Sequence, residues 1–301
     1  MTLHPLVAAL GGELYAGGCR ANVPAPGHSA ADRSVSLMLA EGRVIIHGFG
    51  GADWRAVRDD LRRRGFIDDA GRLTGRGSAG PSAPRPDRRV RLETAAELWR
   101  GGVTLHDATP SARHLRRRAV EAGAQALNLL HHPNAPVSVY RRAGRACPAL
   151  MARVSDSADQ LTAIELTYLD ASGRLASGLA LRRKTVGLVP PGAAVRLARA
   201  AEAMLVGEGV VTTLSAMQRF RLPGWALMAA HNLAAWTPPP GVRQVLIAAD
   251  RGEVGQDAAD RLHRRLLRMG VDGVVVWPAA PFGDWNEVEV EAALQRGKQG
   301  G

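Results

Sequence analysis

The C-terminal half of the sequence predicts an α/β fold with a mostly parallel sheet. Three short apolar runs are bounded by glycine or by charge, as buried parallel strands are: Ala203–Val206, Val245–Ala249 and Gly273–Pro278. The segments between and after these runs are expected to be helical: 214–220, 232–236 and 256–269. Strands that alternate with helices in this way form a sheet that is covered by helices on both faces.

An acidic residue follows each of these apolar runs. Glu208 and Asp250 stand at the ends of the first two, and Asp284 follows the third. Ligands of open α/β sheets bind at the carboxyl ends of the strands, so we expect the three side chains to meet at one edge. Mg²⁺ usually takes one or two carboxylates and leaves its other positions to water and phosphate. The pattern therefore predicts a site for Mg²⁺ or Mn²⁺.

The same three segments, 205–209, 248–255 and 283–286, resemble the signatures of the Toprim domain of primases, topoisomerases and related nucleases. The resemblance is strongest to small primase-like proteins of phages and mobile elements, and it extends over most of the chain. It implies that Glu208 is a general acid or base and that Asp250 is the first aspartate of a metal-binding Asp-x-Asp pair. Gly252 replaces the second aspartate, so one metal ligand is missing, and Asp284 is the candidate substitute.

Residues 1–70 resemble the zinc ribbon at the front of bacterial primases. Ala25, Gly48 and Gly51 occupy the positions of family cysteines, and only His28 of the ligand pattern is kept. Structural zinc requires four nitrogen or sulfur ligands. We therefore predict a small β-rich module that contains no zinc and is held together by its apolar strands.

Composition and resemblance together divide the rest of the chain. Residues 71–91 are dominated by Gly, Ser, Pro and Arg and are predicted to be a flexible linker. Residues 92–150 are predicted to be a helical segment. Residues 151–301 are predicted to form the Toprim domain, with its core at 200–290 and a β-hairpin over 161–181 in front of it.

Two groups of polar residues are candidates for substrate binding. Arg182, Arg183 and Lys184 follow the hairpin, and in the resembled family this basic segment lies near the active edge, where it would hold a phosphate backbone or a nucleotide. The alternative is a charged surface loop. His231 and Asn232 follow the expected second strand of the domain and would border the pocket. The alternative for Asn232 is that it caps the next helix.

The net charge of +11 favours a polyanionic partner. This indication is weakened because nearly all the basic residues are arginine, and an Ala- and Gly-rich chain of this kind is typical of a GC-rich genome. The run 116–118 is interpreted as a solvated helix face, with phosphate contact as the alternative.

Several classes of protein are not expected. The two cysteines, Cys19 and Cys147, give no disulfide framework and suit a reducing cytoplasm. No long apolar run predicts a membrane span, and residues 1–10 do not have the pattern of a signal peptide. No phosphate-binding loop of an NTPase motor is present.

These observations lead to one main hypothesis and two alternatives. The main one is a cytoplasmic, primase-like nucleotidyltransferase that uses Mg²⁺ or Mn²⁺ on single-stranded DNA and nucleoside triphosphates, with a replicative helicase as a candidate partner. Glu208 would act on the proton of the 3′-hydroxyl, and it would carry metal together with Asp250 and Asp284. One alternative is an inactive nucleic-acid-binding or replication accessory module, and the other is a Toprim nuclease. The choice between DNA and RNA and the oligomeric state stay open.

Overall fold

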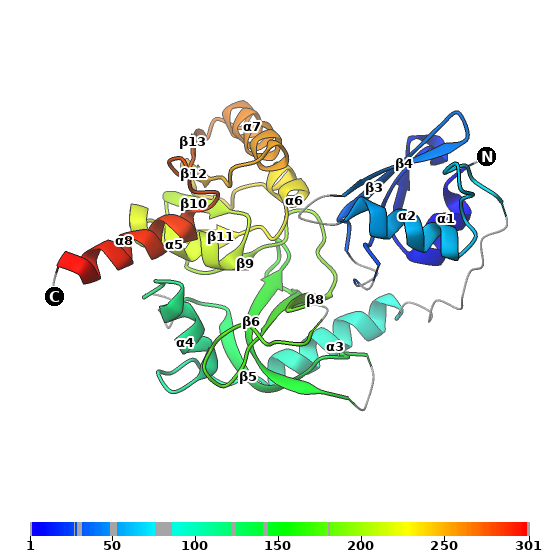
Figure 1. The fold of residues 1–301 in the computed structure, drawn as a ribbon. Coiled ribbons are helices and arrows are strands. Elements are labelled where there is room, and N and C mark those ends of the chain that lie inside the picture. The colour runs from blue at the N-terminus through cyan, green and yellow to red at the C-terminus, as the bar shows by residue number, and fades with distance from the viewer. Residues whose placement is uncertain are drawn as a thin grey trace. The chain divides into compact units, whose positions relative to one another are not determined.

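The computed structural model describes residues 2–26, 28, 32–48, 53–75, 86–121, 125–140, 144–179 and 181–299. The chain divides into two compact units, which are described separately: Met1–Arg85 with Gly178–Leu181, and Pro86–Ser177 with Arg182–Gly301. Figure 1 shows the ribbon and labels helices and strands of both units where there is room. None of the helices in the described ranges combines the length and the apolar character that a membrane span requires.

The first unit is built on an antiparallel sheet whose strands follow one another in sequence order. The strands are β1 (Glu13–Tyr15), β2 (Arg20–Val23), β3 (Val35–Ala40) and β4 (Arg43–Gly48), and the helices are α1 (His4–Leu10), the short 3-10 helix η1 (Ala16–Gly18) and α2 (Trp54–Arg63). Period-two alternation buries Val35 and Leu37 of β3, and these side chains share a core with Val57 and Leu61 of α2.

The expected zinc positions have other roles in this unit. Ala25 is buried in the apolar core, and the imidazole of His28 pairs with Asp32 at 2.8 Å. Gly48 ends β4, and Gly51 lies outside the described residues. Within the described ranges, no three His, Cys, Asp or Glu side chains are grouped so that they would hold a metal. The absence of zinc stays a prediction, which the zinc content of the purified protein tests.

The second unit begins with two helices and a second antiparallel sheet. The helices are α3 (Arg88–Arg100) and α4 (Pro110–Arg117), and the strands, in sheet order, are β5 (Leu129–Pro136), β6 (Ala146–Ser155), β7 (Leu161–Tyr168) and β8 (Arg183–Gly187). Helix α3 packs against β7 and β8, and α4 packs against β5 and β6.

Two expectations are corrected here. The segment 92–150 is helical only in its first part, because it also contains β5 and the start of β6. The strand that pairs with β7 is β8, so Arg183 and Lys184 lie in a strand and not in the loop that follows the hairpin. This strand is hard to recognise in the sequence because it begins with two basic residues, Arg183 and Lys184.

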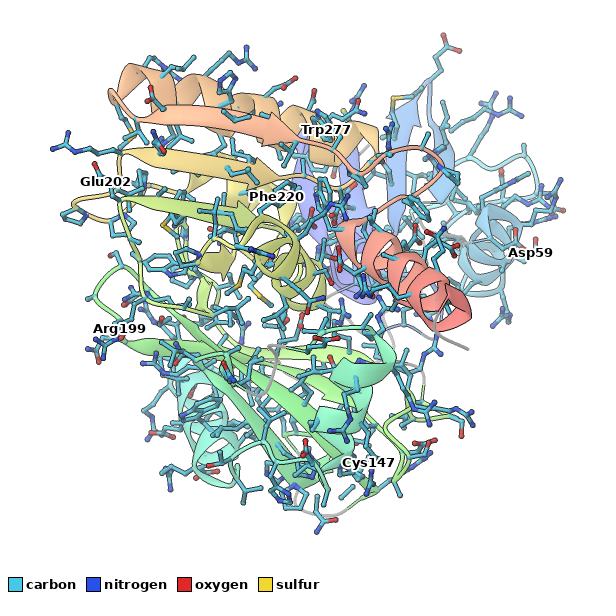
Figure 2. The ribbon with its side chains drawn as sticks, turned by 90° about the vertical axis from the view of Figure 1, so that its left-hand side faces the viewer. Asp59, Cys147, Arg199, Glu202, Phe220 and Trp277 are labelled. Atoms are coloured by element: carbon cyan, nitrogen blue, oxygen red, sulfur yellow. The ribbon has the colours of Figure 1, made fainter. Side chains whose placement is uncertain are left out.

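The C-terminal sheet confirms the predicted α/β class. Its order is β13-β12-β10-β11-β9; the first four strands are parallel, and only β9 runs antiparallel. The strands are β9 (Val195–Arg196), β10 (Ala203–Gly207), β11 (Gly224–Ala226), β12 (Gln244–Ala248) and β13 (Asp272–Val276). In Figure 2, Glu202 marks the amino ends of these strands and Trp277 marks their carboxyl ends.

Four helices cover this sheet, namely α5 (Val210–Phe220), α6 (Ala230–Ala235), α7 (Glu253–Arg268) and α8 (Trp285–Gln299). Strand β10 contributes Met204 and Val206 to the core beneath α6 and α7, and Leu205 to the core beneath α5 and α8. Helix α5 also shares a core with the antiparallel sheet, through Val210, Val211 and Leu214. The second unit is therefore one body in which α5 joins the two sheets.

Candidate functional site

The carboxyl edge of the parallel sheet carries the first two predicted acids. Gly207 and Ala248 are register partners at the ends of β10 and β12. Glu208 follows directly, and Asp250 comes two residues after Ala248. A common strand register therefore delivers both carboxylates to the same edge.

Asp284 reaches this edge through a loop contact. The backbone N–H of Arg251 donates to the carbonyl of Gly283 at 2.8 Å, so the loop after β12 is tied to the loop before α8. An oxygen of Asp284 accepts a hydrogen bond from the N–H of Glu287 at 2.8 Å, and the Glu287 carboxylate accepts one from the N–H of Gly283 at 2.7 Å. This reciprocal cap begins α8 and fixes the position of Asp284.

The Asp250 carboxyl is the most perturbed group at this edge. Burial raises the pKa of Asp250 to about 7, and the nearby charges of Glu208 and Asp284 act in the same direction. Its Oδ1 atom is buried and has no hydrogen-bond partner within the described part of the chain. A cation at this position would give the oxygen a partner and would favour the ionised carboxylate, so the donor set fits Mg²⁺ or Mn²⁺.

The three acids form an open arrangement and not a closed set of ligands. In the described ranges, no three such side chains are grouped at a distance that would hold a metal, although the acids interact electrostatically. Coulombic interaction acts over longer distances than direct coordination. The geometry therefore suits a cation that keeps several waters and binds through one or two carboxylates, as Mg²⁺ does.

Gly252 stands where the second aspartate of the motif is expected. Its φ of 137° and ψ of 148° belong to a region that L-residues rarely adopt. Apart from Gly252 itself and its two chain neighbours, no heavy atom of the described residues lies within 4 Å of the place where a Cβ would be. The place of the missing carboxylate is therefore open space on a backbone that suits glycine.

Two residues of the third motif, Trp285 and Asn286, have structural roles. Trp285 packs edge-on against Phe220, with the ring centroids 5.0 Å apart. The fully buried amide of Asn286 donates to the carbonyl of Arg118 at 2.6 Å and to the hydroxyl of Ser215 at 2.9 Å. Sequence analysis quoted both residues only as part of a motif, and no local pattern distinguishes their structural role.

Replacing Asn286 by alanine is expected to lower the free energy of unfolding by about 1–3 kcal/mol, because the buried carbonyl of Arg118 loses its donor. Chemical denaturation of the intact chain measures this loss. Ser215→Ala is the matched control, because it keeps the bond to Arg118 and should cost less. Equal losses in the two variants would contradict this assignment.

The predicted basic cluster is split by the alternation of β8. Arg183 pairs with Glu165 of β7 at 3.8 Å. Lys184 is half-buried, donates to the carbonyl of Val137 at 2.7 Å and lies 6.0 Å from the centre of the Tyr168 ring. Burial lowers the pKa of Lys184. Adjacent residues of a strand point to opposite faces, so Lys184 is a packing residue and does not act together with Arg183.

Arg118 is a basic residue that sequence analysis did not single out from its run. Arg116 binds Asp107, and Arg117 donates to the carbonyl of Ser172, whereas the Arg118 guanidinium has no hydrogen bond or ion pair within the described residues. The pKa of His114 is lowered mainly by burial and also by the charges of Arg118 and Arg183. The two guanidinium groups therefore lie near one imidazole, and the bond from Asn286 ties Arg118 to the third motif.

Asn232 has a structural role, which gives no support to its expected role in substrate binding. This side chain is buried, and its amide oxygen accepts from the N–H of Gly192 at 2.6 Å. Its amide nitrogen donates to the carbonyls of Leu227, at 2.7 Å, and Ala193. It is not the cap of α6 either, because Ala229 holds that position. The side chain of His231 lies outside the described part.

Comparison with known proteins identifies the two segments of the second unit. A family model of the Toprim domain matches residues 203–294, and a model described as a domain of unknown function matches residues 89–197. No curated protein matches the chain significantly.

Among solved structures, the chain is similar to the primase fragment of the bacteriophage T7 primase-helicase protein, with 14% identity and a TM-score of 0.41, covering 89% of this chain and 93% of that one. It is also similar to the zinc-binding and RNA polymerase domains of the Aquifex aeolicus primase, with 14% identity and a TM-score of 0.46. This match covers 98% of this chain and 81% of that one. A third similar structure is the RNA polymerase domain of the Mycobacterium tuberculosis primase, with 13% identity and a TM-score of 0.42. This match covers 70% of this chain and 82% of that one. At these values the similarity concerns the outline of the fold alone.

Proposed function

We propose that this chain, which carries a Toprim domain over residues 203–294, is a primase-like nucleotidyltransferase that acts on single-stranded DNA with Mg²⁺ or Mn²⁺. The observation that carries the proposal is the buried, unpartnered oxygen of Asp250 beside Glu208 and Asp284 at the carboxyl edge of a parallel sheet. A cluster of this kind is a poor structural element but a suitable cation site, because burial without a partner destabilises the charged carboxylate.

Each residue at the edge has a proposed task. Asp250 and Asp284 would hold the divalent cation, and Glu208 would accept the proton of the attacking 3′-hydroxyl. The 3′-oxygen forms a bond to the α-phosphorus of a nucleoside triphosphate, and pyrophosphate leaves. When bound, the cation neutralises phosphate charge and orients the attacking oxygen.

Two arginines are proposed to hold the substrate. The charges of Arg118 and Arg183 both act on the imidazole of His114, and the backbone carbonyl of Arg118 accepts a hydrogen bond from Asn286 of the third motif. Arginine binds phosphate through two parallel hydrogen bonds, and phosphate contacts position a strand without reading its sequence. Arg182 is exposed and remains a proposed substrate-binding residue. Lys184 and Asn232 are not included in the proposal.

Glu208→Gln is expected to abolish primer synthesis while leaving the folded protein intact. The assay supplies single-stranded DNA, nucleoside triphosphates and Mn²⁺, and it measures both oligonucleotide products and nicked template. Arg118→Ala is the companion variant, and we expect it to raise the KM for nucleotide about tenfold, since a charge-assisted contact of this kind contributes about 1.5–3 kcal/mol. Primer synthesis that survives Glu208→Gln would contradict the assignment.

The same assay separates the two alternative functions. Because Gly252 stands in place of the second aspartate, one expected carboxylate is missing. This favours the alternative in which the protein is an inactive module that binds nucleic acid. Salt-sensitive binding of DNA without any product would support that module. Nicked template without primers would support a Toprim nuclease.

The remaining expectations follow from this function. The proposal includes a cytoplasmic location, an origin in a phage or another mobile element, and a replicative helicase as partner. A pull-down with the purified helicase of the host cell, compared with the same experiment on the Glu208→Gln variant, tests the partner independently of catalysis.

A further inference from the structure

The outer face of α7 carries a patch that neither the fold nor the proposed reaction uses. Arg261, Arg264, Leu267 and Arg268, called the α7 patch here, line a surface hollow of about 660 Å³. Leu267 is 56% exposed, and Met269, two residues further along the chain, is 44% exposed. Isolated exposed apolar residues are common, but Leu267 lies in a hollow that three arginines line with it.

The arginine side chains of the patch are arranged along the helix. The Nε atom of Arg264 donates to the carbonyl of Asp260 at 3.2 Å, and that of Arg268 donates to the carbonyl of Arg264 at 3.2 Å. Within the described residues these bonds engage only the Nε atoms, so the terminal nitrogens of Arg264 and Arg268 can pair with other groups. The result is an apolar floor with a cationic rim.

Helix stability explains only part of this pattern. Cations in the last turn interact favourably with the helix dipole, which accounts for Arg268. It does not account for Arg261, whose contact with Asp257 is long, at 3.8 Å, and highly exposed, nor for the exposed Leu267. The patch also lies away from the acidic edge, because Arg264 is about 16 Å along the helix from its first residue.

We propose that the α7 patch is the docking site for an acidic amphipathic helix of a partner protein. The apolar side chains of such a helix would cover Leu267, and its carboxylates would pair with the arginines around it. A nucleic-acid backbone would satisfy the arginines but would leave Leu267 exposed, which favours a protein. This inference is independent of the proposed catalysis.

A second copy of the chain is a poorer occupant. The chain has a net charge of +11, so two copies repel one another. Its acidic helix α8 is already engaged, because Glu287 caps the helix and the buried Glu289 pairs with Arg219 at 3.2 Å. The acidic partner segment must therefore come from another protein.

The test uses the intact chain and three fluorescent probes. The first is a designed helical peptide with leucine along one face and glutamate on the others, the second is the same peptide with serine in place of leucine, and the third is a single-stranded oligothymidylate. Fluorescence anisotropy measures binding to the wild type, to Leu267→Ser and to Arg264→Glu. Arg296→Glu, an exposed position on α8, is the matched charge control.

The leucine peptide is expected to bind the wild type and the Arg296→Glu control equally, and to bind Leu267→Ser and Arg264→Glu about tenfold more weakly, as loss of an interface anchor predicts. Hydrogen exchange should slow over residues 261–269 in the complex. Failure of the leucine peptide to bind overturns the proposal, as does equal binding to Leu267→Ser. Loss of oligothymidylate binding in Arg264→Glu without peptide binding would assign the patch to nucleic acid instead.

Discussion

Asp250→Asn is expected to stabilise the metal-free protein at pH 8 by up to about 4 kcal/mol and to have almost no effect near pH 4. The folded-state pKa of Asp250 is about 7, whereas an unfolded aspartate has a pKa of about 3.9. Between these values the folded state holds a proton that the unfolded state has lost. Stability of the wild type therefore falls as the pH rises through this window. The asparagine variant does not have this ionisation, so its advantage grows over the same range.

Urea denaturation of both proteins at several pH values between 4 and 8, with a chelator present, measures the difference. Asp257→Asn is the matched control, because Asp257 is highly exposed and its replacement should leave the pH dependence unchanged. Adding Mn²⁺ at pH 8 should stabilise the wild type and not Asp250→Asn, since a ligand stabilises only the state that binds it. A stability difference that is the same at every pH would show that Asp250 titrates normally.

The acidic edge could be predicted from sequence because a general rule of parallel sheets fixes it. Once the apolar runs before Glu208 and Asp250 are strands, their register brings both carboxylates to one edge. The third acid required a motif, because its loop is tied to the others by contacts such as those from Arg251 to Gly283 and Pro278. Local patterns contain no information about such loop contacts.

Two of the expected substrate-binding residues form structural hydrogen bonds. Lys184 donates to one backbone carbonyl, and Asn232 donates to two backbone carbonyls and accepts from the N–H of Gly192. A sequence shows that a side chain can form hydrogen bonds, but it does not show which partner takes them. Arg118 is the converse case. Its neighbours Arg116 and Arg117 form hydrogen bonds, and only the structure shows that the Arg118 guanidinium forms none within the described residues.

Gly252→Asp is expected to strengthen Mn²⁺ binding by about tenfold or more, because the number of charged ligands sets the affinity of such a site. Open space receives the new side chain, but the backbone φ of 137° is unfavourable for it. The strain and the repulsion from Asp250 should lower the stability of the metal-free variant by about 1–3 kcal/mol. Calorimetric titration with Mn²⁺ and urea denaturation measure the two effects.

Gly252→Ala separates strain from ligation, because it imposes the same backbone conformation without a carboxylate. It should lose stability as Gly252→Asp does and bind Mn²⁺ no better than the wild type. If primer synthesis also rises in Gly252→Asp alone, the absent ligand limits the reaction. If alanine and aspartate change Mn²⁺ affinity equally, position 252 acts through the backbone, and the acidic edge binds its cation through Glu208, Asp250 and Asp284 alone.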